Sequence, residues 1–295
     1  MEALLYGLLR SLGDTGVSER AHVAVLDFGL SDSARVGLAE LCDEVIDPRP
    51  IAASTIAFSD PQDATVLCRV LLPAMVPGHD IYLWIDADVW VQDAQMLDVF
   101  ASFTTAKDVV VVAETDPAYG GIQRRHDWIV SRADAMYGAE TAHQLSIRPC
   151  LNAGVIAARA SSPLWRVWLD HLRALGNRQR RLLCDQTSLN YLVFCRQISA
   201  YLLPPVYNWV CHAATPKWLM EEGYWARPLF PHAKIAVMHL TSSSRPFSAD
   251  FTDGHETFTV DLSYDSAVKL REWSAGRNAG QLSRSSTFPD MLAIP

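Results

Sequence analysis

Short apolar runs alternate with segments of helical periodicity along most of the chain. The apolar runs are rich in β-branched residues, as buried strands are. They lie at residues 21–28, 44–47, 80–85, 109–113, 150–158, 200–203 and 234–238. Apolar residues at helical spacing predict helices over residues 2–12, 31–41, 60–76, 93–103, 128–137 and 163–175, and from residue 184 onward. The alternation predicts an α/β protein whose central sheet is mostly parallel and flanked by helices.

Length and composition fit one large α/β domain, since the chain has 295 residues, of which 49% are hydrophobic. No internal repeat or linker divides it. We therefore expect one domain over residues 1–262, followed by a C-terminal helix and tail over residues 263–295. The net charge of −8 argues against a general nucleic-acid-binding protein. No apolar run reaches the roughly 18 residues that a membrane-spanning helix needs, so we expect no transmembrane segment.

The cysteines and the N-terminal residues indicate a cellular compartment. The six cysteines are scattered and form no C-x-x-C pair. This pattern argues against structural zinc and favours reduced thiols, which predicts a cytoplasmic protein. Residues 1–12 carry leucines at helical spacing without a basic segment or cleavage site, so they predict an amphipathic helix and not a signal peptide. Peripheral attachment at the inner membrane face remains open.

One apolar run ends in a pair of carboxylates. Residues 80–85 lead directly into Asp86 and Asp88, which flank the small residue Ala87. A carboxylate at the end of a buried strand has to be paired, protonated or bound to a cation. Two carboxylates in this arrangement can hold one Mg²⁺ or Mn²⁺ ion, and the carboxyl ends of strands are where open α/β sheets bind ligands. An Asp-rich turn without a ligand is the alternative that this stretch alone leaves open.

Four further points along the chain carry polar residues, three of them at expected strand ends or helix starts. They are the Asn152-Ala153-Gly154 segment, the Asp185-Gln186 pair, His239 and Arg245. An imidazole from His239 would complete a mixed ligand set that suits Mn²⁺ better than Mg²⁺, and Arg245 could neutralise phosphate charge. A glycine at position 154 weakens a strand unless something approaches its backbone closely. Taken singly, His239 could be an ordinary hydrogen-bonding residue, Asp185 a helix cap and Arg245 a surface residue.

Together and in this order, these motifs resemble the GT-A glycosyltransferases, specifically the retaining family 8 that contains glycogenin and the bacterial lipopolysaccharide galactosyltransferases. The resemblance extends from the first helix to about Phe247. It rests on residues 71–73, 81–89, 151–155 and 185–190, and on His239 with Arg245-Pro246-Phe247. It implies a single GT-A, Rossmann-like nucleotide-diphospho-sugar transferase domain. It also implies the transfer of a hexose, with retention, from a UDP-sugar to an acceptor hydroxyl.

The resemblance also assigns residues to roles. As metal ligands for Mn²⁺, or Mg²⁺, it implies Asp86, Asp88 and His239. As residues that bind the nucleotide-sugar donor it implies Arg69, Asp86, Ala87, Asn152, Ala153, Gly154 and Arg245. As catalytic residues it implies Asp185 and Gln186. The expected acceptor is a glycan, a lipid-linked molecule or a protein, as in the assembly of a bacterial polysaccharide. The aromatic residues Tyr207, Trp209, Trp218, Tyr224 and Trp225 would either contact it or form core.

The chain departs from the family pattern at three places. It begins where the first strand of the family, which holds the base, should already have ended, so we expect that strand to be missing and the exposed neighbouring edge, residues 23–28, to permit a homodimer. Ser242 replaces a glycine, and Phe247 replaces a tryptophan. Two other functions remain open. One is a degenerate glycosyltransferase that acts as a binding or scaffold protein. The other is a haloacid-dehalogenase-type phosphatase, whose Asp-x-Asp strand does not usually carry a residue such as Trp90.

Overall fold

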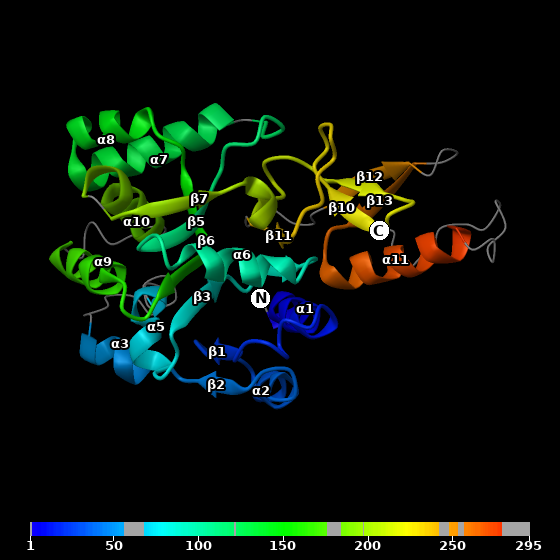
Figure 1. The fold of residues 1–295 in the computed structure, drawn as a ribbon, viewed down its shortest axis with the longest axis horizontal. Helices are drawn as coiled ribbons and strands as arrows, with labels where there is room; N and C mark the ends of the chain where they lie inside the picture. Colours follow the sequence, from blue (N-terminus) through cyan, green and yellow to red (C-terminus); the bar gives the residue numbers. More distant parts are fainter. Residues whose placement is uncertain are drawn as a thin grey trace.

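The computed structural model describes residues 2–55, 68–120, 122–175, 184–196, 198–241, 248–252 and 257–278. Figure 1 shows strands in the middle of the molecule with helices around them. The helices are α1 (Glu2–Asp14), α2 (Asp32–Leu38), α3 (Arg49–Thr55), α5 (Leu72–Met75), α6 (Gln95–Phe103), α7 (Ile122–Tyr137), α8 (Ala139–Ser146), α9 (Pro163–Ala174), α10 (Cys184–Cys195) and α11 (Tyr264–Asn278), with 3-10 turns η1 (Cys68–Leu71) and η2 (Pro205–Tyr207). The strands are β1 (Ala24–Leu26), β2 (Glu44–Ile46), β3 (Ile81–Ile85), β4 (Val89–Val91), β5 (Val109–Ala113), β6 (Leu151–Arg159), β7 (Ala200–Leu203), β8 (Trp209–Val210), β9 (Lys217–Leu219), β10 (Tyr224–Ala226), β11 (Val237–His239), β12 (Ser248–Thr252) and β13 (Thr257–Asp261).

The central sheet has the strand order β3-β6-β5-β7. Strand β6 is antiparallel to both β3 and β5, whereas β5 and β7 are parallel. Strands β3, β5 and β7 therefore share one direction, and the reversed β6 lies between two of them. The α/β class is confirmed, but the expectation of a mostly parallel sheet is wrong in its pairing, because the sheet is mixed. A strand buried on both faces is a continuous apolar run in either direction, so the sequence pattern does not encode the reversal.

A second sheet, β4-β11-β8, completes the site region. Strand β11 is antiparallel to β4 and parallel to β8. Its register sets His239 opposite Val89, which directly follows the acidic pair. The strands β1 and β2 form a separate parallel pair, and β9–β10 and β12–β13 are antiparallel pairs.

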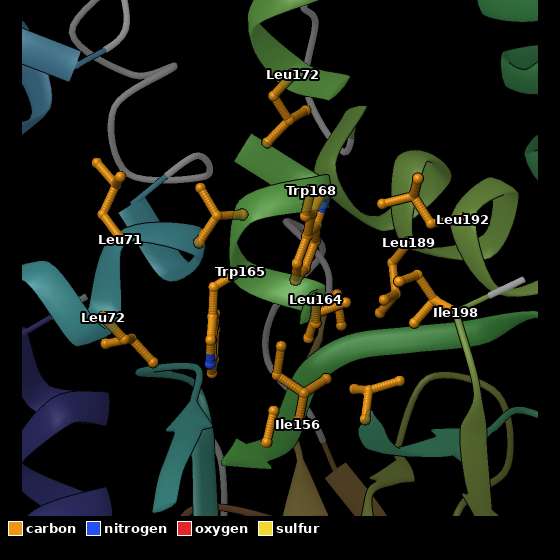
Figure 2. Close-up of a cluster of buried hydrophobic side chains, with 14 of the residues drawn as sticks. Leu71, Leu72, Ile156, Leu164, Trp165, Trp168, Leu172, Leu189, Leu192 and Ile198 are labelled. Carbon is orange, nitrogen blue, oxygen red and sulfur yellow. The ribbon is translucent and has the colours of Figure 1, made fainter. Parts of the chain in front are cut away.

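Helices cover both faces of the central sheet. Alternate residues of a strand point to opposite faces, and in β5 Val109 and Val111 belong to one core cluster while Val110 and Val112 belong to another. Figure 2 shows the first cluster, in which α9 and α10 pack over β6. Its fully buried members include Ile156, Leu164, Trp168, Leu172 and Leu189. In the second cluster α1 and α6 cover the other face through Leu8, Leu9, Leu12, Met96 and Phe100.

Helix α9 illustrates how the sequence determines a boundary. The Ser162 hydroxyl accepts a hydrogen bond from the backbone N–H of Leu164 at 3.1 Å, and Pro163 occupies the first turn, where its missing N–H costs nothing. Burying Leu164, Trp168 and Leu172 of this helix then contributes roughly 1.5–3 kcal/mol for each large apolar side chain. The cap and the apolar face together fix where this helix begins and which side it presents to β6.

Other boundaries differ from the expectations. Helix α7 begins at Ile122, earlier than expected, and α8 was not expected at all. Gly138, with φ of 86°, separates the two, and α8 buries only Ala142 and Leu145, which leaves too weak an apolar pattern to detect. The first half of the expected helix over residues 60–76 lies outside the described residues, and the rest forms η1 and the short helix α5. No helix in the described part of the chain is long and apolar enough to span a bilayer.

Candidate active site

The acidic pair lies in the short turn that joins β3 to β4. The backbone N–H of Asp86 donates to the carbonyl of Gly154 on β6 at 2.8 Å, and the carbonyl of Asp88 accepts from Leu240, just after β11, at 2.9 Å. The turn is thus held on one side by the central sheet and on the other by the second sheet. The side chains of Asp86 and Asp88 are 26% and 22% exposed, and Ala87 between them is half-buried.

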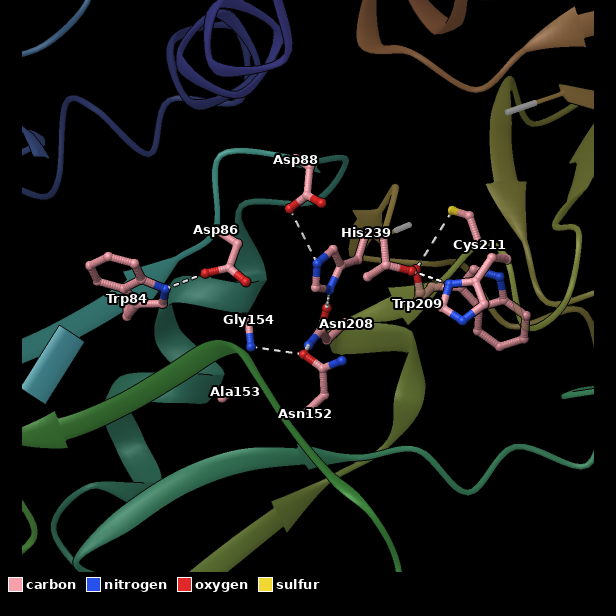
Figure 3. A network of polar contacts seen from close by, with 12 residues as sticks. Trp84, Asp86, Asp88, Asn152, Ala153, Gly154, Asn208, Trp209, Cys211 and His239 are labelled. Atoms are coloured by element: carbon pink, nitrogen blue, oxygen red, sulfur yellow. Dashed lines mark hydrogen bonds and ion pairs between the residues drawn. The ribbon is translucent and has the colours of Figure 1, made fainter. Parts of the chain in front are cut away.

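The structure brings the three predicted metal ligands together. His239 ends β11 and is 3% exposed, and its Nε2 lies 3.3 Å from Asp88 Oδ1. One ligand atom from each of Asp86, Asp88 and His239 lies within 4.8 Å of the other two (Figure 3). Two partly exposed carboxylates and one imidazole form a donor set that fits Mn²⁺. Both carboxylates are partly exposed, so a ligand from solution can reach an ion held there.

Gly154 makes this approach sterically feasible. A Cβ atom at position 154 would lie 2.3 Å from His239 Cε1 and 3.0 Å from Asp86 Oδ2. Real Cβ atoms do not approach heavy atoms as closely as 2.3 Å, so any other residue would displace the imidazole or the strand. The close neighbour that the sequence predicted for this glycine is therefore the ring of His239.

Arg69 lies beneath the acidic pair and is almost fully buried. Its Nε lies 3.0 Å from Asp185 Oδ2, its Nη2 lies 3.3 Å from Asp86 Oδ1, and its Nη1 donates to the carbonyl of Ala153 at 2.6 Å. The guanidinium carbon lies 5.1 Å from the ring centroid of Trp84, whose indole N–H donates to Asp86 Oδ1 at 2.5 Å. Burial alone would lower the pKa of Arg69, but Asp185 and Asp86 raise it. The guanidinium therefore links a candidate metal ligand to a candidate catalytic carboxylate.

Asp185, in the first turn of α10, is fully buried. Neither of its carboxylate oxygens has a hydrogen-bond partner within the described residues, since the contact with Arg69 is an ion pair without hydrogen-bond geometry. Burial raises the pKa of Asp185, although the charge of Arg69 acts to lower it. A buried carboxylate with so few partners is costly, and such groups concentrate at functional sites.

The side chains of Gln186 and Asn152 accept hydrogen bonds from backbone N–H groups at the start of β6. Gln186 Oε1 accepts from the N–H of Ala153 at 3.2 Å, and the N–H of Gly154 donates to Asn152 Oδ1 at 2.8 Å. Gln186 and Asn152 are 9% and 5% exposed. Asn152, Ala153 and Gly154, which the resemblance assigned to the donor site, thus lie at the start of β6, beside the acidic pair. Their roles remain predictions.

Two polar residues near the site were missed. Asn208 and Glu114 are 1% and 7% exposed, and they bind His239 Nδ1 and Asn152 Nδ2 respectively. Glu114 directly follows the apolar run 109–113, so its position at a strand end was the available signal. Asn208 lies between aromatic residues and carried no such signal.

The remaining expected site residues fall into three groups. Tyr207 and Tyr224 are half-buried, and their contact with an acceptor stays a prediction. Arg245, Ser242 and Phe247 lie outside the described residues. Trp209, Trp218 and Trp225 are buried, at 0%, 6% and 1% exposure, and pack with helix α11 in a third core cluster. Side chains so deeply buried cannot meet an acceptor, so for these three tryptophans the alternative that they form core holds.

The arrangement of helices and strands around this site is that of a GT-A fold. The structure is similar over 98% of its length to an active-site mutant of LgtC, at 15% identity, 94% coverage of that chain and a TM-score of 0.54. It is similar to the galactosyltransferase LgtC in complex with donor and acceptor sugar analogs, at 16% identity, 98% and 94% coverage and a TM-score of 0.51. The bifunctional glycosyltransferase WbbM matches 96% of this chain over 50% of its own, at 15% identity and a TM-score of 0.53.

These likenesses confirm the GT-A fold that the motif resemblance implied. No protein-family model matches the sequence, and no curated protein matches it. At identities of 15–16% a structural likeness establishes the fold, whereas function belongs to the site and has to be argued from its residues.

Proposed function

We propose that this protein is a metal-dependent glycosyltransferase that moves a hexose from a UDP-sugar to an acceptor hydroxyl with retention of configuration. The observation that carries the proposal is the cluster of Asp86, Asp88 and His239 at the end of β3, beside the buried Arg69–Asp185 pair. A metal site next to buried charged groups at a strand end fits the position that GT-A folds use for a nucleotide-diphosphate sugar.

The residues of the cluster fit Mn²⁺, with Mg²⁺ as the alternative. A cation bound there would act as a Lewis acid on the leaving diphosphate. Asp86 and Asp88 would contribute the negative charge that holds the cation, and His239 the neutral nitrogen. Arg245 is proposed to hold the diphosphate by its charge.

Asp185 is the proposed catalytic carboxylate. It would stabilise positive charge at the sugar carbon that reacts, either electrostatically or as a nucleophile. Arg69 would position Asp185 and Asp86 relative to each other, since one guanidinium is within ion-pair distance of both. Gln186 is proposed to act beside Asp185, and Asn152, Ala153 and Gly154 to line the donor sugar. A glycan, lipid-linked or protein acceptor fits this chemistry equally.

A degenerate glycosyltransferase that acts as a binding or scaffold protein with the same fold is the second candidate. The phosphatase interpretation loses its support, because the chain has the GT-A fold.

The test is calorimetry of UDP binding with and without Mn²⁺, combined with an assay for Mn²⁺-dependent hydrolysis of a panel of UDP-sugars. We expect UDP binding to require Mn²⁺. We expect Asp88→Ala to abolish this binding, since removing one of two carboxylate ligands leaves too little negative charge to hold the ion. Circular dichroism should show that the variant stays folded, because Asp88 lies in a partly exposed turn. Unchanged Mn²⁺–UDP binding in Asp88→Ala would refute the metal site. Intact binding without hydrolysis or transfer would favour the binding protein.

A further inference from the structure

Four buried polar side chains form a continuous chain of hydrogen bonds that ends at the ring of His239. In order they are Glu114, Asn152, Asn208 and His239, exposed by 7%, 5%, 1% and 3%. Asn152 Nδ2 lies 2.7 Å from Glu114 Oε1, Asn208 Nδ2 lies 2.9 Å from Asn152 Oδ1, and Asn208 Oδ1 lies 2.8 Å from His239 Nδ1. Figure 3 shows the links from Asn152 to His239.

The orientation of the first amide follows from its neighbours. The backbone N–H of Gly154, 2.8 Å from Asn152 Oδ1, can only donate. The Glu114 carboxylate, on the other side of the amide, accepts when ionised. Rotating the Asn152 amide by half a turn would set N–H against N–H and oxygen against oxygen. Two independent partners therefore fix Asn152 with its oxygen toward Asn208.

The orientation of the second amide then follows from the first. Because Asn152 presents an oxygen, Asn208 has to present its NH₂ group to make the 2.9 Å contact. The Asn208 oxygen consequently faces His239 Nδ1 at 2.8 Å, and that nitrogen has to carry a proton to donate to it. A neutral histidine with its proton on Nδ1 has its free lone pair on Nε2.

The free lone pair is on the side of the acidic pair, since Nε2 is the ring nitrogen that lies 3.3 Å from Asp88 Oδ1. Metal-binding histidines usually donate their second ring N–H to a neighbouring acceptor, which fixes both the tautomer and the ring orientation. Here the acceptor is an amide whose own orientation derives from a backbone N–H on β6.

We propose that Asn208 is a positioning residue that holds His239 in the tautomer required for metal binding, with Asn152 and Glu114 fixing the orientation of Asn208. The inference rests on the proposed metal site. It assigns a role to a residue outside the proposed ligand set, and it links the proposed sugar-binding segment of β6 to the proposed metal ligand on β11.

Nitrogen NMR of the metal-free protein tests the tautomer without reference to activity. Proton–nitrogen correlations of protein labelled with ¹⁵N-histidine distinguish the two neutral tautomers at about pH 8.5, above the usual histidine pKa of about 6.5. The chain has nine histidines, so the His239 signals are assigned by their loss in His239→Gln. We expect wild-type His239 to carry its proton on Nδ1.

Two substitutions at position 208 separate positioning from packing. Asn208→Leu keeps the side-chain size but removes the acceptor, so we expect a population of the Nε2-protonated tautomer and Mn²⁺ affinity lower by about 10- to 100-fold. Asn208→Asp keeps an oxygen facing Nδ1, so we expect it to retain the wild-type tautomer and bind Mn²⁺ more tightly than Asn208→Leu. Calorimetry with Mn²⁺ alone measures the affinities.

Gln92→Leu is the matched control. Gln92 is also a buried amide, and its NH₂ group donates to the carbonyls of Trp225 and Ile235 at 2.8 and 2.6 Å, away from His239. We expect this variant to lose stability while the His239 tautomer and Mn²⁺ affinity stay at wild-type values.

The two ways of failing are distinguishable. Protonation of wild-type His239 on Nε2, or an Asn208→Leu variant with unchanged tautomer and Mn²⁺ affinity, would overturn the role of Asn208 while leaving the metal site intact. If wild-type protein does not bind Mn²⁺, or Asp88→Ala binds it equally well, the proposed function fails. In that case the tautomer of the metal-free Asn208→Leu variant still decides whether Asn208 orients the ring.

Discussion

At the scale of single residues, the site is defined by how closely unlike groups approach one another. Asp86 meets an indole N–H, a guanidinium and a backbone carbonyl within one turn. The imidazole ring of His239 packs against the backbone of Gly154, where any other residue would have a Cβ atom. Each contact depends on one atom being present or absent, so small substitutions should have large and specific effects.

Gly154→Ala should disable metal binding. The added methyl would lie 2.3 Å from His239 Cε1, so the imidazole has to leave its position. We expect calorimetry to show Mn²⁺ affinity reduced at least about tenfold, as for displaced metal ligands in general. Gly120→Ala is the control, since its new methyl would have its nearest neighbour at 3.8 Å. Wild-type affinity in Gly154→Ala would mean that His239 is not a ligand.

Asp185→Asn should impair catalysis more than binding. The amide keeps the size of the side chain but removes the charge that would stabilise the reacting sugar carbon. We expect turnover of a UDP-sugar to fall by about 100-fold, or about 2.7 kcal/mol of barrier, with little change in Mn²⁺–UDP affinity. Turnover at the wild-type rate would reduce Asp185 to a structural partner of Arg69.

At the scale of elements, polar groups at strand ends hold the neighbouring turns. Asp27 follows β1, and its Oδ1 accepts from the N–H groups of Gly29 and Leu30 at 2.7 Å each, while Oδ2 pairs with Arg35 of α2. The Ser31 hydroxyl caps the same helix. Asp86, paired with Asp88, belongs to the candidate metal cluster, whereas the single Asp27 at the end of β1 holds a turn.

Asp27 predicts a pH-dependent contribution to stability. Burial alone would raise its pKa, but hydrogen bonds from Leu30, Arg35 and Gly29 lower it below the ordinary value of 3.8. A carboxyl with a lowered pKa in the folded state stabilises the protein above its unfolded pKa, and this stability is lost as the pH falls through the folded pKa. We expect Asp27→Asn to cost about 1–3 kcal/mol at pH 7, as for hydrogen bonds to charged groups.

Urea unfolding of wild type and Asp27→Asn across the pH range measures this effect. The difference in unfolding free energy between the two proteins should be full near pH 7 and should shrink below the ordinary pKa of 3.8. Asp98→Asn is the control, since the side chain of Asp98 is 62% exposed and pairs with Arg20 on the surface. A difference that does not depend on pH would show that packing, not charge, is the contribution of Asp27.

At the scale of the whole molecule, the sequence predicted the candidate site better than the strand arrangement. Asp86, Asp88 and His239 were identifiable because polar residues directly follow apolar runs, and such residues need partners. Asn208 was not, since its function depends on a neighbour far along the chain. The reversed direction of β6 could not be predicted either, because a strand buried on both faces has the same apolar pattern in either direction. Contacts between distant segments are what periodicity cannot encode.

The turn with the acidic pair is hydrogen-bonded to β6 on one side and to the residue after β11 on the other. This arrangement has a consequence for the folding and unfolding rates. The three ligands become neighbours only after strands from distant parts of the chain have paired, which is slow and occurs late in folding. An ion that needs all three cannot assist the early steps. Mn²⁺ should therefore slow unfolding while leaving the folding rate nearly unchanged, since it stabilises contacts that form after the transition state. Stopped-flow unfolding in urea with and without Mn²⁺ tests this, and faster folding with an unchanged unfolding rate would contradict it.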